Sequence, residues 1–214
     1  MKLYIAQATC SLAVQLVANE LGLNPELIHY DVFDKSTTAN DNFAEVNPLG
    51  YVPVLVLDDA AKTHLTETVV ITSFLADQQL AAGLIPPHGT LDRVKFDQLL
   101  TMLATEIAQK HIPLMRKLQT EFGTEWTRNK LVVAYTKLDE QLADGRSYLL
   151  GEQFTVADAY VWATMWHERS GAEITHLKHL MAYIDRITAR PAAAKALKDE
   201  AELVSRHAAM KLAA

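Results

Sequence analysis

Strand-like patterning is confined to the early part of the chain, and this limits the possible folds more than any other feature of the sequence. Residues 2–6 are apolar and rich in strand-forming types, as in a buried strand. Apolar side chains then recur at helical spacing from Leu12 to Leu21, and Gly22 follows where a helix would end. Residues 27–32 are strand-like again. This order predicts a parallel strand–helix–strand unit.

Two further short strands and a helix complete this early region. Residues 54–57 form a compact apolar strand, and residues 63–65 could pair back on it as a short antiparallel strand. Thr66 and Glu67 then lead into an amphipathic helix, whose apolar residues between positions 70 and 75 share one face.

The composition changes after Leu80. Residues 81–90 contain two glycines and two prolines and are the best linker candidate. Helical patterning then fills the rest of the chain, in the stretches 91–118, 125–142, 155–168, 176–189 and 192–214. We therefore predict an α/β domain over residues 1–80, a linker over residues 81–90 and an all-helical domain over residues 91–214.

Charge and cysteine content argue against several classes of function. The net charge of −6 would repel a phosphate backbone, so no nucleic-acid partner is expected. A single cysteine permits no intrachain disulfide and fits a reducing compartment, so we expect a cytoplasmic protein. The N-terminus lacks a secretory-signal pattern, and no stretch approaches the roughly 20 apolar residues of a membrane span. No membrane partner is expected either.

Cys10 is the first candidate for chemistry, because it lies where a strand ends and a helix begins. Free backbone N–H groups and the helix dipole at such a position stabilise a thiolate. The alternative is that Cys10 is a small buried apolar residue, which is the usual role of a lone cysteine. Ser11 beside it is a plausible N-cap of the helix.

Two other segments could contact a peptide-like ligand. A proline directly before a strand, such as Pro53, either forms a rigid turn or follows a cis bond that turns the backbone of Val52 toward a ligand. About one X–Pro bond in twenty is cis, so the sequence alone favours trans. Glu67 and Thr68 precede a helix, where the helix dipole favours an acid. Their alternative role is to hold the amino and carboxyl ends of a bound amino acid.

The remaining motifs favour structure over chemistry. Thr155 and Asp158 match a capping box, in which a Ser or Thr is followed three residues later by an acid, so this pair should start a buried helix. His176 and His179 could share a helix face, but no cysteine or acid completes a metal-ligand pattern, so no metal site is predicted. The chain has no phosphate-binding glycine-rich loop and no Gly-x-Ser-x-Gly motif.

Four segments are informative through their order and spacing. They are Met1–Tyr4 with Ala8–Ala13, Asn47–Leu55, Leu65–Ile71 and Phe154–Tyr160. In this order they resemble bacterial beta-class glutathione transferases over nearly the whole chain, and Cys10 argues for the beta class. The resemblance implies a thioredoxin-like first domain, an all-helical second domain and a homodimer, with glutathione lying mainly on the first domain.

The resemblance also implies a set of glutathione-binding residues. This set is Cys10, Lys35, Tyr51, Val52, Pro53, Glu67 and Thr68. By position, Cys10 would be the catalytic residue and face the glutathione sulfur. The backbone of Val52 would bind the cysteinyl part of the peptide, with Pro53 cis. Glu67 and Thr68 would hold the γ-glutamyl end, and the other two residues are weaker candidates beside the peptide.

The long helix departs from the family pattern. Beta-class relatives carry a His-Lys pair shortly before a Pro-Leu, and counting back from Pro113 this chain has Ala108 and Gln109 at those places. Lys110 and His111 follow at once, but a helix turns about 100° per residue, so they face elsewhere unless the register slips. We therefore expect weak conjugation.

The predicted function is a glutathione transferase, with glutathione as co-substrate, no other cofactor, and a small hydrophobic electrophile or a disulfide as substrate. Two reactions remain open. The protein could stabilise the glutathione thiolate for attack on an electrophile, as in detoxification. Alternatively, Cys10 could form a mixed disulfide with glutathione and pass it on by thiol–disulfide exchange. The competing hypothesis is a non-catalytic binding or regulatory module of the same fold.

Overall fold

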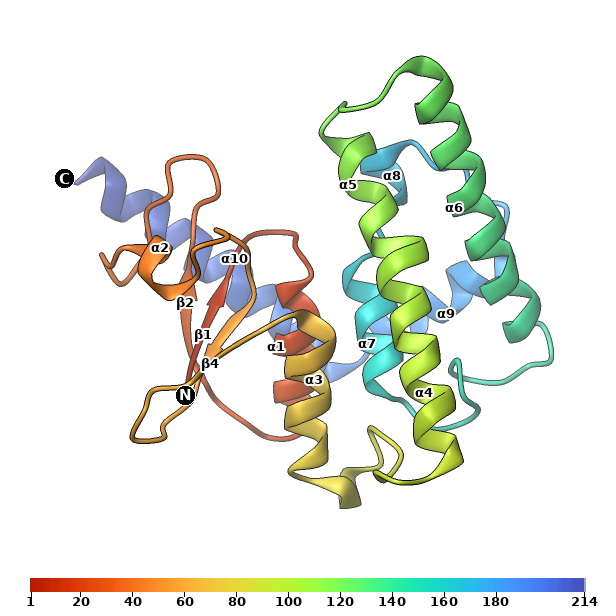
Figure 1. The fold of residues 1–214 in the computed structure, drawn as a ribbon, viewed down its shortest axis with the longest axis horizontal. Coiled ribbons are helices and arrows are strands. Elements are labelled where there is room, and N and C mark those ends of the chain that lie inside the picture. Colours follow the sequence, from red (N-terminus) through yellow and green to blue (C-terminus); the bar gives the residue numbers. More distant parts are fainter. Residues whose placement is uncertain (214) are drawn as a thin grey trace. The chain divides into compact units, whose positions relative to one another are not determined.

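The computed structural model describes residues 1–213, which form two compact units (Figure 1). The first unit comprises Met1–Gln79 together with the segment from Arg190 onward, and the second comprises Leu80–Ala189. The α/β character of the early region and the helical character of the rest are confirmed. Within residues 1–213, no helix is both long and apolar enough to cross a membrane.

The first unit is built on a four-stranded mixed sheet with the strand order β2-β1-β3-β4. Strand β1 (Lys2–Ile5) pairs in parallel with β2 (Glu26–His29). Helix α1 (Ser11–Glu20) connects them, which confirms the predicted strand–helix–strand unit. Antiparallel pairing joins β1 to β3 (Val54–Val56), and β3 to β4 (His64–Thr66), as the sequence suggested for the second pair.

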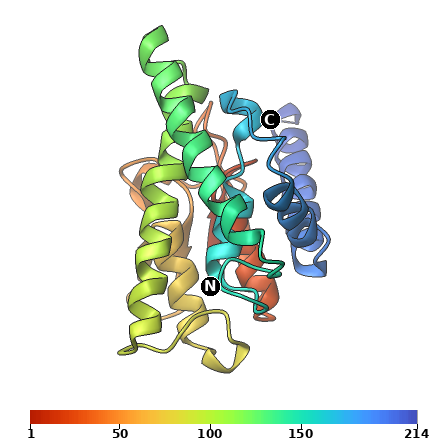
Figure 2. The same ribbon diagram turned by 90° about the vertical axis from the view of Figure 1, so that its right-hand side faces the viewer.

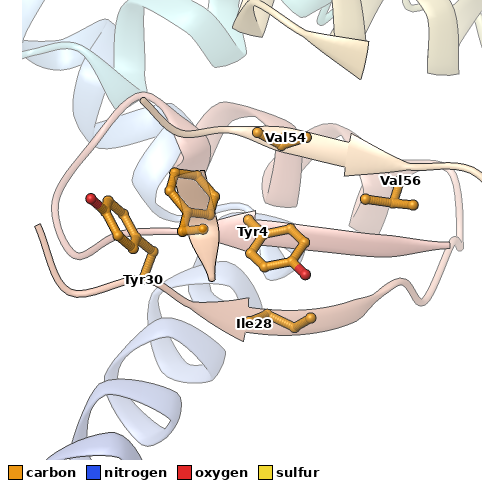
Figure 3. Close-up of a cluster of buried hydrophobic side chains, with 6 residues drawn as sticks. Tyr4, Ile28, Tyr30, Val54 and Val56 are labelled. Atoms are coloured by element: carbon orange, nitrogen blue, oxygen red, sulfur yellow. The ribbon is translucent and has the colours of Figure 1, made fainter. Parts of the chain in front are cut away.

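Side chains alternate along these strands, so the sheet has two buried faces. Helices α1 and α3 (Thr68–Asp77) lie along one face (Figure 1). A cluster of buried side chains covers the other face (Figure 3), and it consists of Tyr4, Ile28, Tyr30, Phe43, Val54 and Val56. Phe43 enters this cluster from the short helix α2 (Phe43–Val46), and its ring stacks on that of Tyr30 with 4.0 Å between the centroids. The alternation of side chains along the strands therefore determines which face of the sheet packs against the helices.

The last helix, α10 (Pro191–Leu212), belongs to the first unit, whereas residues 91–214 were predicted to form one helical domain. It packs against α1 and β2. Asn19 of α1 donates a hydrogen bond of 3.0 Å from Nδ2 to the carbonyl of Ala192. The first buried residues of α10 are Ala193 and Ala196. Because the small alanine side chain can pack against many surfaces, the residue spacing predicts a helix here but not the element against which it packs.

The second unit consists of helices and their connections, with one isolated β-bridge between Tyr148 and Gly151. Its elements are a 3₁₀ turn (Leu80–Ala82), α4 (Leu91–Met102), a π-helical segment (Leu103–Ala108), α5 (Gln109–Met115), α6 (Glu121–Leu142), α7 (Val156–Ala163), α8 (His167–Ser170) and α9 (Lys178–Thr188). Figures 1 and 2 show that α4, the π-helical segment and α5 follow one another as a long rod that runs beside α6.

The rod expected over residues 91–118 is interrupted by the π-helical segment. A π turn holds more residues than an α turn, so it changes which side chains face inward after it. Ala108 and His111 are buried, Gln109 is exposed, and Lys110 forms an ion pair of 2.8 Å with Glu106. Lys110 is therefore engaged in an ion pair on its own helix, and His111 lies inside the unit.

His111 is part of a buried hydrogen-bonded network in the second unit. Its Nδ1 lies 2.8 Å from Oγ of Ser170, and its Nε2 lies 2.8 Å from the hydroxyl oxygen of Tyr135. Burial, with the nearby charges of His167 and Arg169, lowers the pKa of His111 to about 4. The imidazole is therefore neutral at pH 7, and both of its nitrogens are engaged inside the unit.

Acid should destabilise the protein through this histidine. The folded-state pKa of about 4 lies below the ordinary 6.5, so between these values the unfolded chain binds a proton that the folded chain does not. The free energy of unfolding should therefore fall as the pH drops below 6.5, and by about 2 kcal/mol at pH 5 from His111 alone. Urea unfolding at pH 7.5 and pH 5 measures this loss.

The matched comparison is His111→Gln against His179→Gln, because His179 is exposed on α9. The first variant should lose much of the acid dependence, and the second should keep it. An unchanged pH dependence in His111→Gln would contradict the assignment.

Candidate functional site

The loop between β1 and α1 is tied down by its own side chains. The hydroxyl of Thr9 donates to the carbonyl of Ala6 at 2.8 Å, and the hydroxyl of Ser11 lies 2.8 Å from that of Thr9. The Ser11 hydroxyl also accepts a hydrogen bond of 3.3 Å from the N–H of Ala6 and donates one of 3.3 Å to the carbonyl of Ala6. The prediction that Ser11 caps α1 is wrong, because its hydroxyl points back to the strand and Cys10 occupies the N-cap position without a side-chain cap bond.

Cys10 lies at this helix start beside two other predicted residues. Its Sγ is 3.7 Å from the carbonyl oxygen of Val52, a distance at which the thiol donates a weak hydrogen bond. The side chain of Thr68 also lies beside Cys10 and lowers the pKa of its thiol. Three segments that are far apart in the sequence thus meet at one sulfur.

Burial raises the pKa of the Cys10 thiol, and the nearby carboxylate of Glu67 raises it further. The hydrogen bonds from Thr68 and from the backbone act in the opposite direction but are smaller effects. We expected the helix start to stabilise a thiolate at Cys10. The net direction is the opposite, because the thiol is partly buried and desolvation raises its pKa more than Thr68 and the backbone hydrogen bond lower it.

The turn before β3 presents the backbone of Val52. The Val52–Pro53 peptide bond is cis, as the resemblance implied. Asn47 holds this turn, because its Nδ2 donates to the carbonyl of Tyr51 at 2.8 Å and its Oδ1 accepts from the N–H of Leu49 at 3.1 Å. Asn47 was not among the predicted site residues, although Asn in front of Pro-x-Gly is a recognisable turn signal.

Glu67 and Thr68 stand at the junction of β4 and α3. Glu67 is exposed and has a φ of 66°, a left-handed conformation that costs a non-glycine residue roughly 1–3 kcal/mol and often marks a binding site. Thr68 is buried and starts α3. The backbone therefore presents the carboxylate of Glu67 to the surface beside the Cys10 site.

The two weaker candidates are less closely tied to Cys10. Lys35 is exposed in the loop after β2, and its N–H donates to the carbonyl of Asp31 at 2.8 Å. Tyr51 is 59% exposed, and its carbonyl rather than its ring takes part in the turn. No hydrogen bond within residues 1–213 links either side chain to Cys10.

A cavity of about 450 Å³ in the first unit lies elsewhere, between Glu26 of β2 and the α10 residues Asp199 and Arg206. None of the predicted glutathione-binding residues lines it. Among the described residues, no group of three or more His, Cys, Asp or Glu side chains is placed to hold a metal ion.

Family models match both parts of the chain. Residues 9–78 match the glutathione S-transferase N-terminal domain, and residues 103–200 match the glutathione S-transferase C-terminal domain. Glutathione S-transferase GstA of Escherichia coli O157:H7 is 33% identical over 94% of this chain and 98% of its own length. Glutathione S-transferase GST-4.5 of Xanthomonas campestris is 31% identical over the same shares of the two chains.

Solved structures agree with the family models. The ternary complex of BphK, a bacterial glutathione transferase, has a TM-score of 0.88 and 33% identity, covering 94% of this chain and 100% of that one. A sphingomonad glutathione S-transferase complexed with glutathione has a TM-score of 0.86 and 34% identity, covering 94% and 99% of the two chains. The family models and these relatives cover nearly the whole sequence, so the chain belongs to the glutathione S-transferase family.

Proposed function

We propose that the chain binds glutathione on its first unit and transfers it to electrophilic or disulfide substrates at a site assisted by Cys10. The observation that carries this proposal is the meeting of Cys10, the Val52 carbonyl and Thr68 at one sulfur. The backbone of Val52 would pair with the cysteinyl part of glutathione in the manner of a strand. That placement would bring the glutathione sulfur to Cys10.

In conjugation, the glutathione thiolate attacks the electrophile and the leaving group departs, while Cys10 donates a hydrogen bond to the attacking sulfur. Its raised pKa suits this role, because the group remains a thiol at neutral pH. In exchange, the Cys10 thiolate attacks the glutathione-side sulfur of a mixed disulfide and releases the substrate thiolate. A second glutathione thiolate then attacks the glutathione sulfur of the Cys10–glutathione disulfide, which forms glutathione disulfide and releases the Cys10 thiolate.

We further propose that Glu67 binds the α-amino group of glutathione. Glu67→Gln should weaken glutathione binding roughly ten- to hundredfold, since a hydrogen bond to a charged group contributes about 1.5–3 kcal/mol. Isothermal titration calorimetry with glutathione measures this effect. Glu26→Gln is the control, because Glu26 is an exposed acid of β2 that lies 3.9 Å from Lys2.

Equal affinities in Glu67→Gln and in the unmodified chain would remove Glu67 from the site. Absence of glutathione binding by the unmodified chain would instead favour a non-catalytic module of this fold.

We also propose that the protein is a cytoplasmic homodimer. Dimers are typical of the family, and α4 carries two exposed apolar side chains, Leu91 and Val94, that an interface would bury. Sedimentation equilibrium at micromolar concentration should give about twice the chain mass of 23.8 kDa. A mass near that of the single chain would overturn the proposal.

A further inference from the structure

A buried carboxylate of the last helix reaches the loop that carries Cys10. Glu200 of α10 is 6% exposed, and its Oε1 accepts a hydrogen bond of 3.1 Å from the N–H of Ala8. These two residues are 192 positions apart. Ala8 has a φ of 54°, so the loop turns through a left-handed conformation that is unfavourable for alanine. The contact therefore fixes the loop where its backbone is strained.

The surroundings of Glu200 do not compensate its charge. Its Oε2 is buried without a hydrogen bond of normal geometry, and so are both polar atoms of the Gln15 side chain on α1. Gln15 still interacts with Glu200 and favours its charged form, as does the Ala8 N–H, but burial outweighs both and raises the pKa of the carboxyl. Glu200 forms no ion pair with the residues that the structure describes.

Burying an acid in this way is costly. A carboxylate buried without a cation loses much of its hydration free energy, and one hydrogen bond does not restore it. Glu200 therefore contributes little to the stability of the packing between α10 and α1. The hydrogen bond between Asn19 and Ala192 connects the two helices at a different place. What Glu200 holds specifically is the N–H two residues before Cys10.

We propose that Glu200 is a positioning residue, which fixes the loop at Ala8 and so keeps the Cys10 thiol partly buried beside the Val52 carbonyl. This inference rests on the proposed role of Cys10. When the tie at Ala8 is lost, the loop relaxes and water reaches the sulfur. Desolvation is the main cause of the raised Cys10 pKa, so this relaxation should lower the pKa, while the opposing effects of Glu67 and Thr68 remain.

The experiment follows the alkylation of Cys10 by iodoacetamide between pH 6 and pH 10. The chain has one cysteine, so the rate reports on that thiol alone. Glu200→Met removes the acceptor and should raise the rate at pH 7 roughly three- to tenfold, because only the thiolate reacts and its fraction grows as the pKa falls. Glu200→Gln keeps an acceptor oxygen at the same reach and should leave the pH profile near that of the unmodified chain.

Two controls separate positioning from general loosening. Asn19→Ala breaks a different hydrogen bond between α1 and α10, and Glu202→Met changes an exposed acid two positions along the same helix. Neither should move the profile. If Glu200→Met does not fold, Glu200→Asp serves in its place, because shortening the side chain by one methylene withdraws the carboxylate from Ala8.

The inference is overturned if the profile of Glu200→Met, or of Glu200→Asp in its place, matches that of the unmodified chain. It is also overturned if Asn19→Ala moves the profile equally. These readouts do not depend on transferase activity. Failure of the proposed function would appear instead as full activity in a chain lacking Cys10.

Discussion

Replacing Cys10 with alanine should abolish glutathione–disulfide exchange and reduce conjugation only partly. In exchange the Cys10 sulfur forms and breaks a bond, so nothing in the loop can substitute for it. In conjugation it donates one hydrogen bond to a charged sulfur, which contributes about 1.5–3 kcal/mol, or roughly a ten- to hundredfold effect on rate. The two assays are reduction of a glutathionylated disulfide and conjugation of an aryl halide.

Cys10→Ser provides the matched control, because a hydroxyl keeps the donor and removes the nucleophilic sulfur. It should lose exchange as completely as Cys10→Ala and keep more of the conjugation. Since the Cys10 pKa is raised, exchange by the unmodified chain should also accelerate as the pH rises above 7. Equal losses in both assays, or exchange that survives without the sulfur, would show that Cys10 does not have this role.

Replacing Asp158 with alanine should cost about 4 kcal/mol or more in the free energy of unfolding. Asp158 is fully buried at the start of α7, and the predicted capping box with Thr155 is present. Its Oδ1 accepts from the N–H of Leu149 at 2.9 Å and from the hydroxyl of Tyr183 at 2.8 Å. Its Oδ2 accepts from the N–H of Thr155 at 2.8 Å and from its hydroxyl at 2.7 Å.

Truncation to alanine leaves these four donors buried without an acceptor, and each such group costs about 1–3 kcal/mol. Urea unfolding followed by circular dichroism measures the loss. Asp185→Ala is the control, because Asp185 is an exposed acid of α9 and should change stability by less than about 0.5 kcal/mol. A loss below 1 kcal/mol for Asp158→Ala would mean that water or a rearranged loop satisfies the donors.

Local signals in the sequence predicted the features that depend on neighbours along the chain. The capping box at Thr155 needs only two residues three positions apart, and it is present. The apolar runs at residues 2–6 and before Asp58 predicted strands that the structure contains. The cis bond before Pro53 is different, because the sequence alone favoured trans and only the resemblance pointed to cis.

Features that depend on distant residues could not be predicted in this way. The pKa of Cys10 is set by how deeply the thiol is buried beneath other segments, and helix position alone suggested the opposite direction. The partner of α10 and the contact between Glu200 and Ala8 join opposite ends of the chain. The inward position of His111 depends on a π-helical segment that no residue pattern announced.

The first unit begins at the N-terminus but is completed only by α10, so its synthesis ends after that of the second unit. The whole of Leu80–Ala189 has been synthesised before the helix that packs against α1 is made. Until then α1 has one side without its partner, including the surface around Gln15 that α10 buries in the finished protein. A nascent chain of this protein therefore holds an unfinished N-terminal unit after the whole of its helical unit has been synthesised, and a fragment ending at Gln79 would keep that surface exposed to solvent.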